Sequence, residues 1–166
     1  ESFTDVNGNK DREFVKFLDL PSRTPSHFQL AVNGPHELLR ERGWNPVDAM
    51  RVSRSPWDYR RFIQQSRGEF GIAKHAYVSR RSGWFSDRTE CYLASGRPAV
   101  VQDTGWSEHL PSTTGLLPFS NTEEALEALA RLDRDYAAHA RAAGEIAEEH
   151  FVAARVLNPL LERACT

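Results

Sequence analysis

The sequence predicts an α/β fold built on a doubly wound parallel sheet, with extra helices at its C-terminal end. Short apolar runs alternate along the chain with segments that carry apolar residues at helical spacing. The 166 residues suffice for one domain with its own core, and a composition of 40% hydrophobic and 27% charged residues is typical of a folded globular protein. Strands that alternate with helices of this length form right-handed βαβ units, in which the strands run parallel.

In the first half of the chain, helices are recognised by spacing and by their end residues. Phe14, Phe17 and Leu18 recur at i, i+3 and i+4, which indicates an amphipathic helix. Pro residues favour helix starts and Gly residues favour helix ends, and two later segments show both. The predicted elements are a strand over 2–9, a helix over 11–20, a strand over 28–34, a helix over 35–43, a short strand near 50–52 and a helix over 55–68.

In the second half, an apolar strand is predicted over 69–78, and Ser86 is a suitable N-cap for a helix over 86–96. The Val-rich run that follows is typical of a buried strand. Glutamates in the first turn favour a helix that starts after Ser120. The further elements are a strand over 97–103, a short strand over 115–119, and a helical segment over 133–163 with a break near 158–159.

Composition disfavours several function classes. The net charge of −2 provides no bulk attraction to nucleic acid or to an anionic membrane, and no apolar run approaches the roughly 20 residues of a membrane span. The first residues are polar and lack a signal-peptide pattern, so we expect a cytoplasmic protein. Cys91 and Cys165 lie far apart and outside any metal-binding spacing, which indicates two reduced thiols. The acidic pair Asp133 and Asp135 falls in a predicted helix, so no metal is expected.

Ligands of parallel α/β sheets bind beyond the carboxyl ends of the strands, which directs attention to loops 7–12, 33–36, 74–86 and 103–112. Loop 74–86 is the most informative. Gly83 would let the backbone approach an anion closely, and the next helix offers free N–H groups at its start. Ser86 would cap that helix or turn its hydroxyl to a phosphate, with Lys74 and Arg88 nearby. A capped helix with a solvated basic face explains the same residues.

Three further groups are candidates for ligand contacts. Glu90 can accept hydrogen bonds from vicinal ribose hydroxyls, or it is an ordinary exposed glutamate. Lys10 and Arg12 can meet a diphosphate, although a plain turn between strand and helix is the simpler interpretation there. The loop after the Val-rich strand offers backbone N–H groups and polar side chains, or is only a long surface loop. Its candidate residues are Gly105, Trp106, Ser107 and Glu108.

The stretches "SGWFSDRTECYLASGRPAVVQDTGWSEHLP" and "GLLPFSNTEEALEAL" resemble the C-terminal, donor-binding domain of GT-B glycosyltransferases, in a wording similar to a bacterial subgroup of that family. The resemblance implies a single Rossmann-like domain over 1–166 that belongs to a two-domain enzyme. It implies that Glu90 binds the nucleotide ribose and that the backbone over 83–86 holds the diphosphate. The residues in register are Glu90, Ala94, Gly96, Pro98, Val100, Val101, Asp103, Gly105, Glu108 and 115–117.

By that resemblance the chain is a hexosyltransferase-like enzyme domain that recognises a nucleotide-diphosphate sugar, such as a UDP-sugar, without a further cofactor. Trp84 and Phe85 would belong to the same substrate-binding loop. Basic residues would stabilise the departing diphosphate. The acceptor would lie in an N-terminal partner domain, and no catalytic residue is assigned. The basic candidates are Lys10, Arg12, Lys74, Arg80, Arg81 and Arg88.

The alternative is a catalytically inactive scaffold or partner-binding module with the same fold. Retaining members of the family often carry a Glu eight positions before the ribose Glu, and this chain has Ser82 there. The C-terminal helices would cross to the missing domain or would pair two copies into a homodimer. A flavodoxin-like or receiver domain is disfavoured, because the loop after the first predicted strand lacks an acidic cluster.

Overall fold

The computed structural model describes residues 10–164, and its strands lie in two small parallel sheets. β1 (Gln29–Ala31) pairs with β2 (Asn45–Val47) in one sheet. The second sheet has the order β3-β4-β5 and contains β3 (Glu69–Gly71), β4 (Ala99–Gln102) and β5 (Leu116–Phe119). The prediction of an α/β fold with parallel strands is confirmed. The strand predicted over 2–9 lies outside the described residues.

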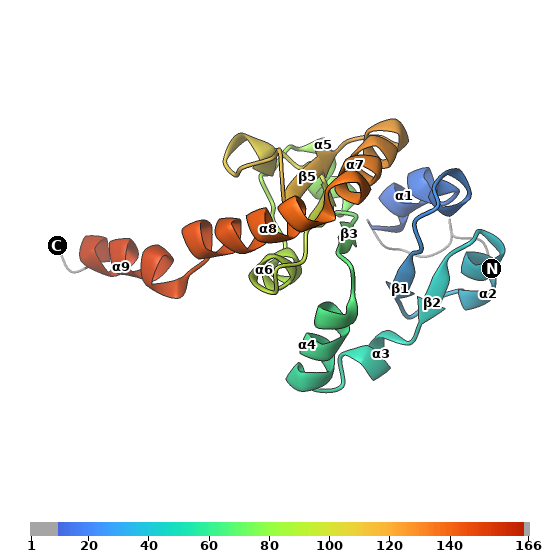
Figure 1. The fold of residues 1–166 in the computed structure, drawn as a ribbon, viewed down its shortest axis with the longest axis horizontal. Helices are drawn as coiled ribbons and strands as arrows, with labels where there is room; N and C mark the ends of the chain where they lie inside the picture. The colour runs from blue at the N-terminus through green and yellow to red at the C-terminus, as the bar shows by residue number, and fades with distance from the viewer. Residues whose placement is uncertain (1–9, 165–166) are drawn as a thin grey trace.

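Helices connect and cover the strands (Figure 1). Several begin at a side-chain cap: Ser55 accepts a hydrogen bond from the backbone N–H of Asp58, Ser86 from Arg88, and Asn121 from Glu124. The helical elements are α1 (Asp11–Phe14), η2 (Val15–Phe17), η3 (Leu20–Arg23), α2 (His36–Glu41), α3 (Ala49–Val52), α4 (Pro56–Gln65), α5 (His75–Ser79), α6 (Asp87–Ala94), η4 (Trp106–Glu108), α7 (Thr122–Arg134), α8 (Tyr136–His150) and α9 (Ala153–Ala164).

The three-stranded sheet buries both of its faces. Val100 and Leu117 pack on one side in a cluster with apolar residues of α1, η2 and α7. Val101 and Leu116 point the other way, into a cluster with residues of α6 and α8. Because successive side chains of a strand alternate between the two faces, a strand covered on both sides reads as the continuous apolar run seen in β4.

An aromatic cluster joins the two sheets. Phe28, directly before β1, has its ring centroid 5.4 Å from that of Phe70 in β3 and 5.0 Å from that of Trp44, directly before β2. Phe70 in turn stacks on Phe119 of β5 at 5.0 Å. Three of these rings belong to one cluster of buried residues and Phe70 packs against it, so the two sheets share one apolar core. Each aromatic pair adds about 1 kcal/mol of stability beyond the contribution of its buried area.

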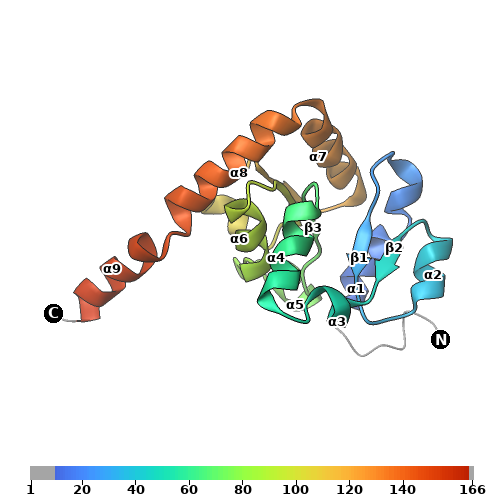
Figure 2. The ribbon, with the colours of Figure 1, turned by 60° about the horizontal axis from the view of Figure 1, so that its bottom comes forward.

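The last helix, α9, extends away from the body of the molecule (Figures 1 and 2). It leaves Val156, Leu157, Leu160 and Leu161 exposed on its surface. Within residues 10–164, every helix is too short or too polar to reach across a lipid bilayer.

Two predicted elements in the first half of the chain differ from the structure. The helix expected over 11–20 is divided into α1 and two 3-10 turns. The indole N–H of Trp44 donates to the carbonyl of Leu18 at 2.8 Å, so that carbonyl is taken by a side chain from elsewhere in the chain. The strand expected near 50–52 is instead the helix α3, which Asp48 caps by accepting from the backbone N–H of Met50 at 2.9 Å.

Two more differences fall in the second half. The strand expected over 69–78 ends at Gly71, and α5 starts at His75. The backbone N–H of Ala73 donates to the side chain of Gln102 rather than to a neighbouring strand, which ends the ladder. The helical break expected near 158–159 occurs at residues 151–152. There Phe151 leaves the helix and stacks on Phe85 with a centroid distance of 5.5 Å.

Candidate functional site

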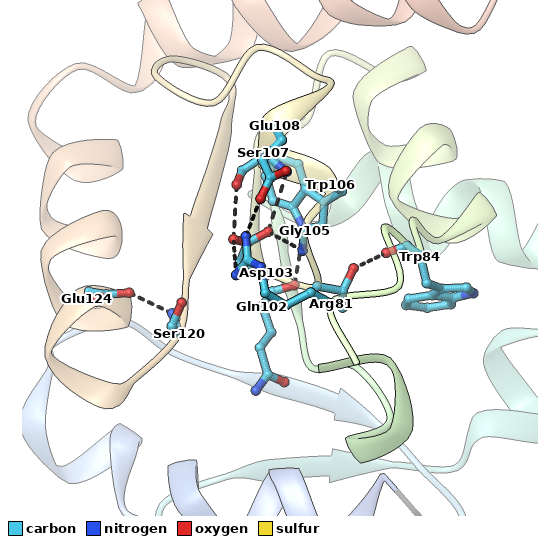
Figure 3. Close-up of polar contacts among 11 residues, drawn as sticks. Arg81, Trp84, Gln102, Asp103, Gly105, Trp106, Ser107, Glu108, Ser120 and Glu124 are labelled. Atoms are coloured by element: carbon cyan, nitrogen blue, oxygen red, sulfur yellow. Dashed lines mark hydrogen bonds and ion pairs between the residues drawn. The ribbon is translucent and has the colours of Figure 1, made fainter. Parts of the chain in front are cut away.

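The loops that follow α5 and β4 are tied together at the carboxyl edge of the sheet. The backbone N–H of Gly83 donates to the carbonyl of Thr104 at 2.8 Å. The hydroxyl of Thr104 donates to the carbonyl of Trp84 at 2.6 Å (Figure 3). These two bonds fix the loop before α6 against the loop after β4, so the two predicted ligand loops form one surface.

Lys10, Lys74 and Arg88 form a group that we call the cationic cluster. Desolvation by the surrounding protein and the positive charges of Arg88 and Lys74 lower the pKa of Lys10 to about 8, whereas the carboxylate of Glu69 opposes this shift. Lys10 nevertheless keeps an exposed surface. The three cations lie in segments far apart in the chain, and their mutual repulsion favours an anion between them.

Glu69 is the carboxylate that partly neutralises this cluster. Its side chain is 3% exposed, and its Oε1 accepts from the Nε of Arg88 at 2.5 Å. The carboxyl lies beside Gly71, where an added Cβ would come within 3.2 Å of Oε1. Its Oε2 is buried without a hydrogen-bond partner. Glu69 and Asp11 are the two carboxylates that act on the three cations, which leaves one positive charge in excess.

The start of α6 contributes a cap and an accessible carboxylate. The hydroxyl of Ser86 is buried and accepts from the backbone N–H of Arg88 at 3.3 Å, so it serves the helix as a cap. Glu90, one turn later, is half-buried, and no hydrogen bond engages its carboxylate within residues 10–164. Burial and the negative charge of Asp87 raise the pKa of Glu90. This carboxylate is free to accept hydrogen bonds from a ligand.

The three aromatic residues predicted at the site pack against other aromatic side chains of the protein. Trp84 stacks on Tyr77, with centroids 4.9 Å apart and the rings inclined by 16°. Phe85 packs against Trp106 and Phe151 in the core beneath α8. Trp106 is 1% exposed, and its indole N–H donates to the carbonyl of Gln102 at 3.1 Å. The Trp106 side chain belongs to the core, and Trp84 shapes the loop surface.

The segment 103–108, which we call the Asp103 loop, satisfies most of its own polar groups (Figure 3). The carboxylate of Asp103 accepts from the backbone N–H of Gly105 at 2.9 Å and of Ser107 at 3.4 Å, and from the Ser107 hydroxyl at 3.0 Å. Glu108 pairs with Arg81 at 2.5 Å. The backbone N–H groups of Gly105 and Ser107 are therefore engaged within the protein, whereas that of Trp106 has no hydrogen-bond acceptor within residues 10–164.

Two other predicted residues, Gly83 and Arg12, contribute no polar side-chain contact within residues 10–164. Gly83 has a φ of +71°, and a Cβ placed on it would meet no atom within 4 Å. The glycine is therefore favoured by the backbone turn and not by crowding. Arg12 is exposed and has no ion pair within residues 10–164.

Sequence reasoning missed a buried polar network beside the cationic cluster. Glu13 is fully buried and contacts Lys16, His75 and Gln102. One signal was available in the sequence: Glu13 shares a helical face with Phe17 and Leu20, at i+4 and i+7. A carboxylate within an apolar stripe must have buried partners.

The geometry combines an excess of positive charge, a free carboxylate and a rigid loop surface at the carboxyl ends of β3 and β4. This combination is suited to a ligand that carries both an anionic group and hydroxyl groups. Comparisons of the chain with protein families, with curated proteins and with solved structures found no match.

Proposed function

We propose that this chain is the nucleotide-sugar-binding domain of a GT-B-type glycosyltransferase, with the cationic cluster as its diphosphate site. The observation that carries the proposal is that three cations, Lys10, Lys74 and Arg88, lie close enough for Arg88 and Lys74 to lower the pKa of Lys10, with only two carboxylates, Glu69 and Asp11, acting against them. A diphosphate would supply the missing negative charge. Hydrogen bonds to charged groups contribute about 1.5–3 kcal/mol each, so three strong ones supply about 9 kcal/mol, close to the roughly 8 kcal/mol of micromolar binding.

The lowered pKa of Lys10 supports the same proposal. A lysine with a pKa of about 8 is held in surroundings that disfavour its charge. Arg88 is constrained by its bond to Glu69, and Lys74 lies over the ring of Tyr77 at 5.9 Å. An anion placed among the three would relieve this repulsion, which is how binding sites for phosphates are commonly organised.

Glu90 is the proposed ribose ligand. It lies one turn into α6, two residues after Arg88, and its carboxylate is unengaged within the described part of the chain. A carboxylate accepts two hydrogen bonds from vicinal hydroxyls, as acidic residues of dinucleotide-binding domains do.

In the proposed reaction, an acceptor hydroxyl forms a bond to the anomeric carbon of the sugar while the bond from that carbon to the diphosphate breaks. The electron pair goes to the departing diphosphate, whose charge the cationic cluster stabilises. The acceptor and the group that takes its proton would come from a second domain. This chain by itself would bind the donor but transfer sugar poorly, because the acceptor is not held in place.

The direct test is calorimetric titration of the chain with UDP, GDP, TDP and inorganic diphosphate. We expect one nucleotide to bind with micromolar affinity and inorganic diphosphate to bind more weakly. Glu90→Ala should weaken nucleotide binding about tenfold and leave inorganic diphosphate unchanged. Glu145→Ala, which removes an exposed carboxylate on α8, is the matched control. Failure of every ligand to bind would favour a scaffold that lacks donor binding.

A further inference from the structure

A buried carboxylate next to the cationic cluster orients a histidine. Glu13 is 0% exposed, and Lys16 donates to its Oε1 at 2.8 Å. The Nδ1 of His75 lies 2.6 Å from the same Oε1, and the amide nitrogen of Gln102 donates to Oε2 at 2.7 Å. Every oxygen of this carboxylate is therefore engaged, as a buried charge requires.

The network defines the protonation states of its members. The backbone N–H of Ala73 donates to the Oε1 of Gln102 at 3.1 Å, so the amide of Gln102 must turn its NH₂ group toward Glu13. Burial alone would raise the pKa of Glu13, but the hydrogen bonds from Lys16, His75 and Gln102 lower it overall. Glu13 is thus an ionised acceptor, and the Nδ1 of His75 must carry the proton that lies between them.

The other edge of the imidazole remains open. Within residues 10–164, the Nε2 of His75 has no hydrogen-bond partner, and it is not one of the buried unpaired atoms. The side chain is 25% exposed. His75 directly follows Lys74, and Glu13 lies in the same turn as Lys10, to whose carbonyl its backbone N–H donates at 3.1 Å. His75 is thus adjacent in the chain to one member of the cationic cluster, and its partner Glu13 shares a turn with another.

We propose that His75 is a further ligand-contacting residue of this site, oriented by Glu13 as its positioning residue, and that its Nε2 binds an anionic oxygen of the diphosphate. This inference rests on the proposed function. In the protonated imidazole both nitrogens donate, so Nδ1 bonds Glu13 while Nε2 bonds the ligand. The ring pairs with Glu13 on α1, which also pairs with Lys16 on η2, and Lys74 precedes His75 in the chain.

The Glu13–His75 pair has the arrangement of carboxylate–histidine pairs in enzymes, where the carboxylate fixes the tautomer and the orientation of the ring. A histidine held in this way loses little conformational freedom when it binds, which favours a specific contact over a loose one.

The test is titration with inorganic diphosphate at pH 5.5 and at pH 7.5. We expect His75→Gln to weaken binding about tenfold at pH 5.5, because a donor to the anion is lost. His27→Gln replaces an exposed histidine before β1 and should match the parent chain at both values. If the parent chain binds diphosphate and His75→Gln binds within twofold of it at pH 5.5, the inference is wrong.

A second readout needs no ligand. Nitrogen-15 spectra of the free protein should show the neutral His75 ring protonated at Nδ1, and Glu13→Gln should reduce that preference. Circular dichroism checks that the variant folds. If Glu13→Gln does not fold, the tautomer of His75 in the parent chain by itself tests whether Glu13 positions the ring. A ring protonated at Nε2 would overturn the positioning role of Glu13. Absence of any diphosphate binding by the parent chain would remove the proposed function and this inference together.

Discussion

Two regions at the carboxyl edge of the sheet look alike in sequence and differ in structure. The cationic cluster and the Asp103 loop both combine charged residues with a nearby glycine and a serine. In the Asp103 loop, the carboxylate of Asp103 accepts three hydrogen bonds, and Glu108 is neutralised by Arg81. In the cationic cluster, three cations outnumber the two carboxylates, Glu69 and Asp11, that act on them.

The difference shows that residue types alone do not define a binding site. Polar groups that satisfy one another stabilise a loop and have little left to offer a ligand. Groups whose charges are left unbalanced cost the folded protein some stability, and a ligand recovers that cost. Substitutions in the two regions should therefore separate stability from binding.

The largest effect is expected for Arg88→Met. Removing the guanidinium leaves the buried carboxylate of Glu69 without its partner, which should lower the free energy of unfolding by about 2–3 kcal/mol. Binding of inorganic diphosphate should fall by about a hundredfold or more, because a charged donor of the cluster is lost as well. Urea denaturation and calorimetric titration measure the two effects.

The double variant Arg88→Met with Glu69→Gln separates these contributions. It should regain most of the lost stability, because no unpaired charge stays buried, while diphosphate binding stays weak. Recovery of both properties would show that Arg88 acts only through Glu69 and does not contact the ligand.

For Asp103→Ala we expect a smaller loss of stability than for Arg88→Met, and almost no loss of diphosphate binding. The change removes three hydrogen bonds from the Asp103 loop and should lower the free energy of unfolding by about 2 kcal/mol. Affinity for diphosphate should change less than twofold. Ser107→Ala is the milder control and should cost about 0.5–1 kcal/mol. A large loss of affinity in Asp103→Ala would place the Asp103 loop in the binding site and remove the contrast.

The smallest effect concerns pH. Lys10 has a pKa of about 8 in the free protein, and a bound anion raises that pKa, so binding above pH 8 takes up a proton. Affinity for diphosphate should be unaffected by Lys10 below pH 8 and should fall as the pH rises from 8 to 10. Lys10→Arg remains charged and should lose this dependence. An equal decline in both proteins would show that another group titrates.

Elements with local signals could be predicted from the sequence. Capping residues Ser55 and Ser86 start α4 and α6 as expected, because the cap bonds lie within three residues of the cap. The failures occur where a distant residue intervenes. Two hydrogen bonds show this: one joins Trp44 to Leu18, 26 positions apart, and the other joins Ala73 to Gln102, 29 positions apart. Neither bond can be predicted from the residues that neighbour its ends in the sequence.

The candidate site shows the same division. The sequence indicates Lys74 and Arg88 because both belong to the basic stretch 74–90 around Gly83. Glu69 was not, because it was assigned only to a strand, and its pairing with Arg88 spans 19 positions. Trp106 was assigned to the ligand surface because it follows a strand, but its indole is buried against the core. Which side of a loop a residue occupies depends on contacts that periodicity does not describe.

The cationic cluster also has a mechanical meaning. Lys10, Lys74 and Arg88 belong to three segments of the chain whose like charges push them apart when no anion is present. A diphosphate would act as a clasp that pulls these segments together. Binding should then slow amide hydrogen exchange in α1, in α5 and in the first turn of α6 together. The exchange rate of α9, which extends away from these segments, should not change.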